Sequence, residues 1–172
     1  MSNIILVTYA TYAGSTAGVA EAIGKALATS GLLVEIRPMR EVRDLTQYQA
    51  VVAGSPIHAG RWLPEAVKFV QTHQKALAEK PFAAFLTCVA LTMKNKKYHD
   101  VAVDYMRPVR ELIRPVSEGY FAGELDFSKI PFSLKKLVMR IIVALGVWKA
   151  GDQRDWKAIN AWADSIRPLL LQ

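Results

Sequence analysis

Apolar and polar residues alternate along the chain in blocks that predict strands and helices in turn. Short strand-like runs, of which the third is apolar on both faces, predict strands. These runs cover residues 4–9, 33–37, 50–55, 82–88 and 116–119. Longer stretches with apolar residues at steps of three or four predict amphipathic helices. These stretches cover residues 16–29, 64–77, 98–113 and 156–170.

This alternation indicates the fold class. Continuously apolar strands joined by helices are typical of a parallel sheet that is covered on both faces. We therefore expect an α/β protein with a doubly wound, five-stranded parallel sheet and helices on both faces. A chain of 172 residues fits one domain, which we expect to span residues 1–172.

The residues that this scheme leaves over, near 125–151, predict an extra apolar helical insertion. Within it, residues 132–148 form a basic helix with Leu137 and Ile141 on one face and Arg140 opposite. A helix of this length measures about 25 Å, which is shorter than the roughly 30 Å hydrocarbon core of a bilayer. The helix suits the interface of an anionic membrane, a substrate contact, a core position or a contact with a second copy in a homodimer.

The first predicted strand ends in a loop that is rich in hydroxyl groups and leads directly into a helix. Its residues are Thr11, Tyr12, Ala13, Gly14, Ser15 and Thr16. Free N–H groups and the helix dipole make such a position a binding site for anions. The loop contains no lysine or arginine, so it suits a phosphate that is held by neutral donors. The Walker and three-glycine dinucleotide patterns are absent, and simple helix capping by Ser15 or Thr16 is the alternative.

Composition narrows the chemistry further. The chain has one cysteine, Cys88, and three scattered histidines, which leaves no disulfide within the chain and argues against a protein-bound metal. Cys88 is expected to be a small buried hydrophobe. The first residues show neither a basic leader nor a cleavage site, so we expect a cytoplasmic protein.

The net charge of +7 is concentrated in residues 93–149. Lys94, Lys96 and Lys97 stand together just after the fourth predicted strand. Such a block attracts nucleic acid, anionic lipid or an acidic substrate, and a solvated surface is the alternative. We expect lipid or an acidic small molecule, and no nucleic acid, as the partner.

The loop and its helix carry a resemblance to a known family. The pattern Tyr9-x-Thr11-x-x-Gly14-x-Thr16-x-x-x-Ala20-x-x-Ile23 resembles the FMN-phosphate signature of flavodoxins. It departs at Thr8, where a bulky apolar residue is usual. The resemblance implies a flavodoxin-like sheet with strand order 2-1-3-4-5 and FMN as the cofactor.

The same resemblance implies that two later loops enclose the flavin ring, as expected at the carboxyl ends of parallel strands. The first loop comprises Ser55, Pro56, Ile57, His58, Ala59 and Gly60, and the second comprises Thr87, Cys88, Val89, Ala90 and Leu91. Weaker candidates for substrate binding are Arg61, Trp62, Lys94, Lys96 and Lys97. Trp62 is expected either to stack on the ring or to pack against the protein, and His58 either to bond flavin or substrate or to be solvated.

Three later features of the sequence make the resemblance more specific, to one group of flavodoxin-like enzymes. They are the run from Phe121 to Asp126, the inserted apolar segment and the helix start at Asp155-Trp156. Together they resemble the bacterial menaquinone-dependent protoporphyrinogen IX dehydrogenases. This implies a flavin-dependent dehydrogenase that oxidises protoporphyrinogen IX, or a similar apolar acidic substrate, and passes electrons to a quinone. The basic helix predicted over residues 132–148 adds the expectation of a peripheral position on the inner face of the cytoplasmic membrane.

Three other functions stay open at this point. The first is a flavodoxin-type electron carrier with no substrate of its own. The second is an NAD(P)H-dependent quinone or FMN reductase. The third is a regulatory module that binds FMN or phosphate without catalysis.

Overall fold

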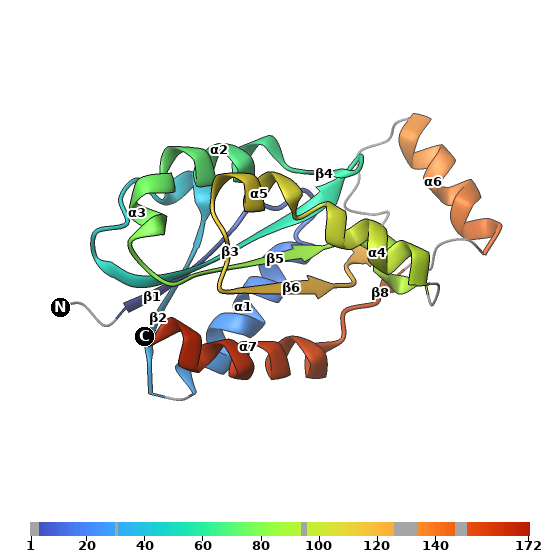
Figure 1. Ribbon diagram of the computed structural model, residues 1–172. Helices are drawn as coiled ribbons and strands as arrows, with labels where there is room; N and C mark the ends of the chain where they lie inside the picture. Colours follow the sequence, from blue (N-terminus) through green and yellow to red (C-terminus); the bar gives the residue numbers. More distant parts are fainter. Residues whose placement is uncertain (1–3, 30, 94–95, 126–133, 147–150) are drawn as a thin grey trace.

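A parallel sheet of five strands forms the centre of the computed structural model, which describes residues 4–29, 31–93, 96–125, 134–146 and 151–172 (Figure 1). The strands are β1 (Ile4–Tyr9), β2 (Leu33–Pro38), β3 (Tyr48–His58), β5 (Phe82–Thr87) and β6 (Ser117–Phe121). Their order across the sheet is β2-β1-β3-β5-β6. Counted in chain order, these five strands have the predicted order 2-1-3-4-5, which confirms the doubly wound α/β fold.

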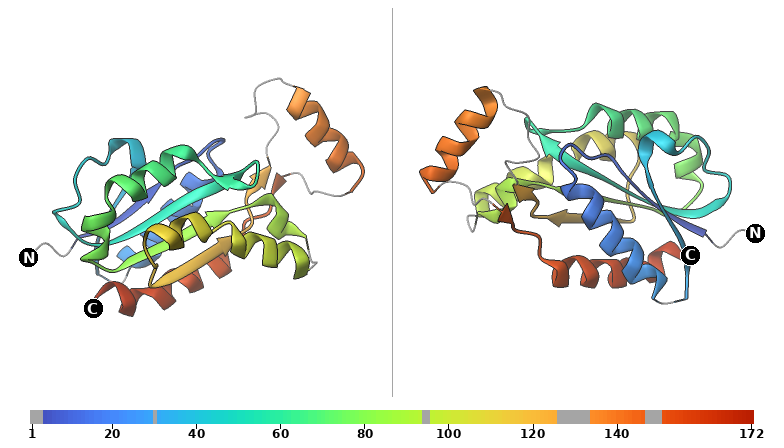
Figure 2. Two further views of the ribbon diagram at one scale, coloured as in Figure 1. Left: turned by 45° about the horizontal axis from the view of Figure 1, so that its top comes forward. Right: turned by 180° about the vertical axis from the view of Figure 1, so that it is seen from behind.

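Helices cover both faces of this sheet (Figures 1 and 2). One face carries α1 (Ser15–Ala28) and α7 (Trp156–Leu170). The other carries α2 (Pro64–Thr72), α3 (Gln74–Ala78) and α5 (Arg107–Leu112), and α4 (Lys96–Asp104) precedes α5. Short 3₁₀ turns, η1 (Met39–Glu41) and η2 (Val89–Thr92), follow β2 and β5.

Two of the expected helices are divided. Residues 64–77 form α2 and α3, and residues 98–113 fall within α4 and α5. The second division has a clear cause in Pro108, because a proline ring clashes with the carbonyl four residues earlier. That carbonyl belongs to Asp104, the residue at which α4 ends.

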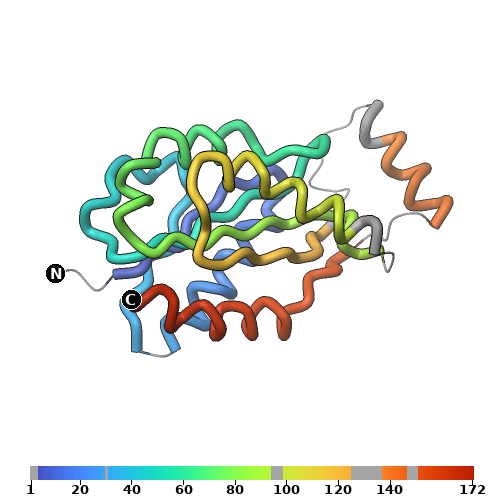
Figure 3. Tube along the Cα trace, viewed as in Figure 1, coloured from blue at the N-terminus to red at the C-terminus, as the bar shows by residue number. Residues whose placement is uncertain are grey.

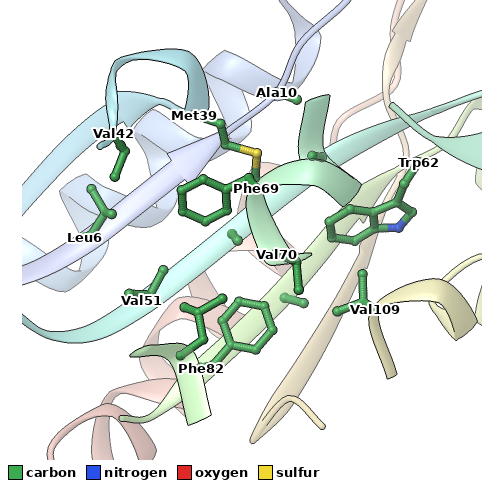
Figure 4. Close-up of a cluster of buried hydrophobic side chains, with 14 of the residues drawn as sticks. Leu6, Ala10, Met39, Val42, Val51, Trp62, Phe69, Val70, Phe82 and Val109 are labelled. Atoms are coloured by element: carbon green, nitrogen blue, oxygen red, sulfur yellow. The ribbon is translucent and has the colours of Figure 1, made fainter. Parts of the chain in front are cut away.

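The core consists of two apolar layers, one on each face of the sheet. Ile5 and Val7 of β1 point to the layer beneath α1 and α7, whereas Leu6 points to the layer beneath α2 and α5. The period of two residues in a strand separates these side chains. Figure 4 shows part of the second layer, in which Trp62 lies near Val109.

The inserted segment leaves and rejoins the body through a short antiparallel ladder. The ladder pairs β7 (Glu124–Leu125) with β8 (Gly151–Asp152). Between them lies α6 (Leu134–Ala144), which stands away from the sheet on the side to which the parallel strands point (Figures 1 and 3). The predicted helix over residues 132–148 is thus confirmed for its central part, and residues 126–133 and 147–150 lie outside the described residues.

The end of β3 turns sharply back into β4 (Arg61–Trp62), where the sequence pattern predicts only a loop. His58 pairs with Arg61 in the antiparallel register, so Ala59 and Gly60 form a two-residue turn. Both have positive φ, 51° for Ala59 and 75° for Gly60. A type I′ turn requires this geometry, and it costs energy at a non-glycine residue.

The substitution Ala59→Asn is expected to stabilise the protein by about 1 kcal/mol, because asparagine tolerates the left-handed conformation that strains alanine. The free energy of unfolding from urea titration measures the change. Ala59→Val is the control and should destabilise, since a β-branched residue avoids positive φ. Equal losses for both variants would contradict the turn geometry.

Candidate functional site

A crevice opens at the carboxyl ends of β1, β3 and β5. It lies beside the point where the chain connections switch from one face of the sheet to the other, the usual ligand position in open parallel sheets. Its inner part is a cavity of about 160 Å³ bordered by the loops after these strands. Its outer part has a volume of about 550 Å³. Ile57, His58, Cys88, Val89 and Met139 line both parts, so the two parts adjoin each other.

The inner end of the crevice is formed by the loop between β1 and α1. Gly14 has a φ of 88° and occupies the N-cap position of α1, where no side chain caps the helix. The structure therefore does not support the alternative that Ser15 or Thr16 simply caps it. The first N–H groups of α1 lack intrahelical acceptors, as at any helix start.

Two hydroxyl groups of this loop accept hydrogen bonds from backbone N–H groups. Gly14 N donates to Thr11 Oγ1 at 3.0 Å, and Glu124 N donates to Ser15 Oγ at 2.8 Å. A hydroxyl that already accepts a bond keeps its own proton available as a donor. Thr11 and Ser15 can thus donate outward, which is the arrangement that an anion requires.

Thr16 lies deeper than its neighbours. Its side chain is fully buried, and its Oγ1 lies 2.8 Å from Thr87 Oγ1 at the end of β5. One of these hydroxyls donates to the other, so the pair retains one proton for a ligand. The pair also joins the first loop to the third across the floor of the crevice.

The outer end of the crevice is a mainly apolar slot with two loop walls. Ile57, His58, Ala59 and Gly60 form one wall, and Cys88, Val89 and Ala90 form the other. Tyr105 closes one edge, and Val138, Met139 and Ile142 of α6 cover the opening. Where the slot meets the inner cavity, the rings of Tyr12 and His58 are stacked with their centroids 4.7 Å apart.

Most of the predicted cofactor residues border the crevice. They are Thr11, Tyr12, Ala13, Ser15, Thr16, Pro56, Ile57, His58, Ala59, Gly60, Thr87, Cys88, Val89 and Ala90. Gly14 shapes the inner loop. Leu91 lines a different hollow beside α7. Ser55 is buried, and its hydroxyl bonds Leu63 N and Pro56 O, so it supports the hairpin instead of facing the ligand.

The structure places the weaker candidates for substrate binding away from the crevice lining or does not describe their side chains. Of the two expectations for Trp62, the structure supports packing against the protein and not stacking on the ring, because the side chain is 2% exposed and lies in the core. The short strand β4 directs it inward, and this strand was not predicted. Arg61 is exposed in β4, next to the hairpin turn. Lys94 and the side chains of Lys96 and Lys97 lie outside the described residues.

Several residues at the crevice were not predicted. Gly123 and Glu124 line its inner end, and Met139 covers both parts. A Cβ atom on Gly123 would lie 3.3 Å from Ser15 Oγ, so a larger residue would press on the loop. Tyr105, Val138 and Ile142 line its outer part and were not predicted either. No local pattern marks any of them, because the contacts join segments far apart in the sequence.

A basic side chain also lies beside the inner loop, although the loop itself has none. Arg154 Nη1 donates to Ser15 O at 3.4 Å, and the guanidinium lies 4.5 Å from the ring centre of Trp156. Its Nε and Nη2 donate to the two carboxylate oxygens of Asp152, each at 2.7 Å. These bonds raise the pKa of Arg154, which stays charged.

Cys88 lies at the wall of the slot and is 7% exposed. Burial raises the pKa of its thiol above the ordinary value. The thiol is therefore neutral at physiological pH and behaves as a small apolar wall residue, as the sequence predicts.

Two negative findings apply to the described part of the chain. It contains no group of three or more metal-ligating side chains, of the kind that could hold an ion. It also has no helix with the length and apolar character needed to cross a bilayer.

Comparison with known families identifies the class of this chain. A family model described as a flavodoxin domain matches residues 6–155. The chain therefore belongs to the flavodoxin family, and this membership confirms FMN as its cofactor. A comparison with curated proteins returned no match.

Solved structures agree with this fold. A short-chain flavodoxin associated with a non-canonical PDU bacterial microcompartment has a TM-score of 0.64 at 16% identity and covers 99% of both chains. A cysteine-to-serine mutant of flavodoxin from Pseudomonas aeruginosa has a TM-score of 0.60 at 13% identity, covering 98% of this chain and 99% of the other. Oxidised flavodoxin 2 from Bacillus cereus has a TM-score of 0.59 at 15% identity with the same coverage. At these identities the likeness shows the fold alone.

Cys88 is expected to react slowly with a water-soluble thiol reagent, because only the thiolate reacts and burial keeps the thiol protonated. Its rate should keep rising with pH past the ordinary thiol range. Absorbance of the released reagent group measures the reaction. Cys88→Ser gives the zero baseline, since the chain has one cysteine. A rate that levels off near neutral pH would contradict the raised pKa.

Proposed function

We propose that this protein binds one FMN noncovalently in the crevice and transfers electrons through it. The observation that carries the proposal is the polarity of the crevice. Its inner end presents hydroxyl and N–H donors at the start of α1, and its outer end is an apolar slot between two loops. A ligand with a phosphate at one end and a flat apolar ring at the other matches this gradient.

The residues present fit each part of FMN. Thr11 and Ser15 would donate to the phosphate with the free N–H groups of α1. The hairpin at Ile57–Gly60 and the loop at Cys88–Ala90 would enclose the ring. When bound, FMN supplies the electron chemistry, while the protein binds, orients and shields it.

The wall composition favours a particular redox behaviour. None of the residues that line the outer slot is acidic in the described part of the chain. A carboxylate beside the ring would oppose a negative charge on reduced flavin. Slot walls without carboxylates therefore make the reduced cofactor easier to form than acidic walls would.

An electron carrier is the function that the family and the fold support best. Such a carrier needs a bound flavin and a surface for its redox partners. The crevice provides the place for the flavin. The family model and the similar structures provide no support for protoporphyrinogen oxidation in particular.

Oxidation of an apolar acidic substrate with a quinone as acceptor is the second candidate, and one observation favours it. The outer slot is lined by Val138, Met139 and Ile142 of α6 as well as by the two loops. An apolar cover over the ring position suits a flat apolar molecule such as a porphyrinogen or a quinone. Under this proposal, Lys94, Lys96 and Lys97 would receive its carboxylates.

The outer surface of α6 supports a further proposal, contact with an anionic membrane. Leu137 and Ile141 of α6 and Leu145 just after it are 49, 51 and 73% exposed, and Arg140 of the same helix is exposed as well. Exposed apolar residues with a basic neighbour are typical of helices at a lipid interface. The corresponding location is the cytoplasm, at the inner face of the membrane. For assembly, the corresponding proposal is a homodimer formed through α6.

Thr11→Val is expected to weaken FMN binding about tenfold or more, because a hydrogen bond to a charged group contributes about 1.5–3 kcal/mol. Riboflavin, which lacks the phosphate, should bind the variant and the parent equally. Quenching of flavin fluorescence measures both dissociation constants. Thr29→Val is the control, because the Thr29 hydroxyl bonds Lys25 O at the other end of α1. Unchanged FMN affinity in Thr11→Val would refute the phosphate site.

An activity assay separates the two candidate functions. For a carrier, the FMN-loaded protein should pass electrons from a chemical reductant to a protein acceptor. It should not oxidise protoporphyrinogen IX with a menaquinone analogue faster than free FMN does. Anaerobic spectroscopy follows both reactions.

A variant in the slot cover makes this assay decisive. If porphyrinogen is oxidised, Met139→Glu should lower that rate about tenfold, because it places a charge in an apolar cover. Transfer to the protein acceptor should fall less than porphyrinogen oxidation, because a carboxylate beside the ring disfavours reduced flavin but does not block a docked protein. If the rate of porphyrinogen oxidation is the same in this variant and the parent, α6 is not part of the substrate site.

A further inference from the structure

We propose that Arg154 is a positioning residue for the phosphate end of the crevice, and that it couples binding of the flavin phosphate to the β7–β8 ladder at the base of the inserted segment. The inference rests on the proposed function, because it assigns the inner loop to the phosphate of FMN. It concerns a residue that stands 139 positions from its partner in the sequence.

The base of the insertion is attached to the phosphate loop by two bonds that converge on one residue. Glu124 N donates to Ser15 Oγ at 2.8 Å, and Arg154 Nη1 donates to Ser15 O at 3.4 Å. Glu124 belongs to β7, and Arg154 lies just after β8. We call Glu124, Asp152 and Arg154 the base clamp. Both ends of the insertion are therefore held by the first residue of α1.

The guanidinium of Arg154 is confined to one place. A Cβ atom on Gly18 would lie 2.6 Å from Arg154 Nη1, so the group rests directly on the first turn of α1. The ring centre of Trp156 lies 4.5 Å from the guanidinium carbon, so the indole also packs on this group. The side chain is 12% exposed. These contacts hold the guanidinium in place and explain why glycine stands at position 18.

Charge explains why the clamp affects the phosphate. Arg154 pairs with Asp152 at 2.7 Å and with Glu124 at 3.5 Å, and Glu124 lines the inner crevice. A bound phosphate monoester carries about −1.5 to −2 at neutral pH. Without the guanidinium, this anion would face both carboxylates with one positive charge fewer nearby. Arg154 thus favours a phosphate that it does not need to touch.

The coupling is reciprocal. If the bonds of the base clamp favour phosphate binding, the bound phosphate must favour those bonds by the same free energy. The clamp also determines where the chain leaves for α6 and returns from it, and Met139 of α6 lines the crevice. FMN should therefore order the base of the insertion, and riboflavin should not.

The test compares two flavins that differ only in the phosphate. In the full-length protein, Arg154→Met should raise the dissociation constant for FMN about tenfold and leave that for riboflavin within about twofold. Arg167→Met is the matched control, since Arg167 pairs with Asp164 near the far end of α7. Its constants for both flavins should equal those of the parent.

Hydrogen exchange gives a second readout. Amide protection at Glu124, Leu125, Asp152 and α6 should increase when FMN binds to the parent protein, and not when riboflavin binds. Arg154→Met should lose this difference. Gly18→Ala should lose part of it, because its methyl group displaces the guanidinium while it favours the helix, so folding is preserved.

The outcomes are distinct. Equal losses of FMN and riboflavin affinity in Arg154→Met would show a merely structural role and overturn the proposal. FMN affinity and protection that resist both Arg154→Met and Gly18→Ala would overturn it as well. A parent protein that does not bind FMN would overturn the proposed function first, and the coupling with it.

Discussion

The parallel pairing of β1 with β2 on one side and with β3 on the other is the constraint on which this structure depends. The chain leaves β1 for α1 on one face of the sheet, and it leaves β3 for α2 on the opposite face. The loops that follow the two strands must therefore diverge. Their divergence opens the crevice, and β5 places a third loop at the same edge. The site is a consequence of topology before any side chain is considered.

Side chains then give the crevice its chemical direction. Hydroxyl groups that accept backbone bonds keep their protons available as donors at one end, and aliphatic and aromatic side chains line the other. The Thr16–Thr87 pair closes the floor between them. This change from hydroxyl donors to apolar walls explains how a loop without a basic residue can bind an anion. A positive charge comes from outside the loop, at Arg154.

The inserted segment is an addition to the sheet and does not alter it. All five parallel strands and both apolar layers are complete without α6. The helix turns Met139 and Ile142 toward the slot and leaves Leu137 and Ile141 exposed. It therefore has an apolar surface toward the cofactor position and another away from it. A minimal electron carrier needs neither, and for this reason α6 is the part of the molecule most informative about specificity.

The sequence by itself determined the five parallel strands, most of the helices, the sheet order implied by the family resemblance and the hydroxyl loop. These features depend on neighbours in the chain, through side-chain periodicity and helix-start chemistry. The break at Pro108 was not predicted, although its cause is local. Only the tertiary structure decided that Trp62 is buried, that Ser55 supports a hairpin and that Arg154 rests on Ser15. Those outcomes depend on an Ala-Gly turn without the usual asparagine and on a contact across 139 residues, and neither leaves a local pattern.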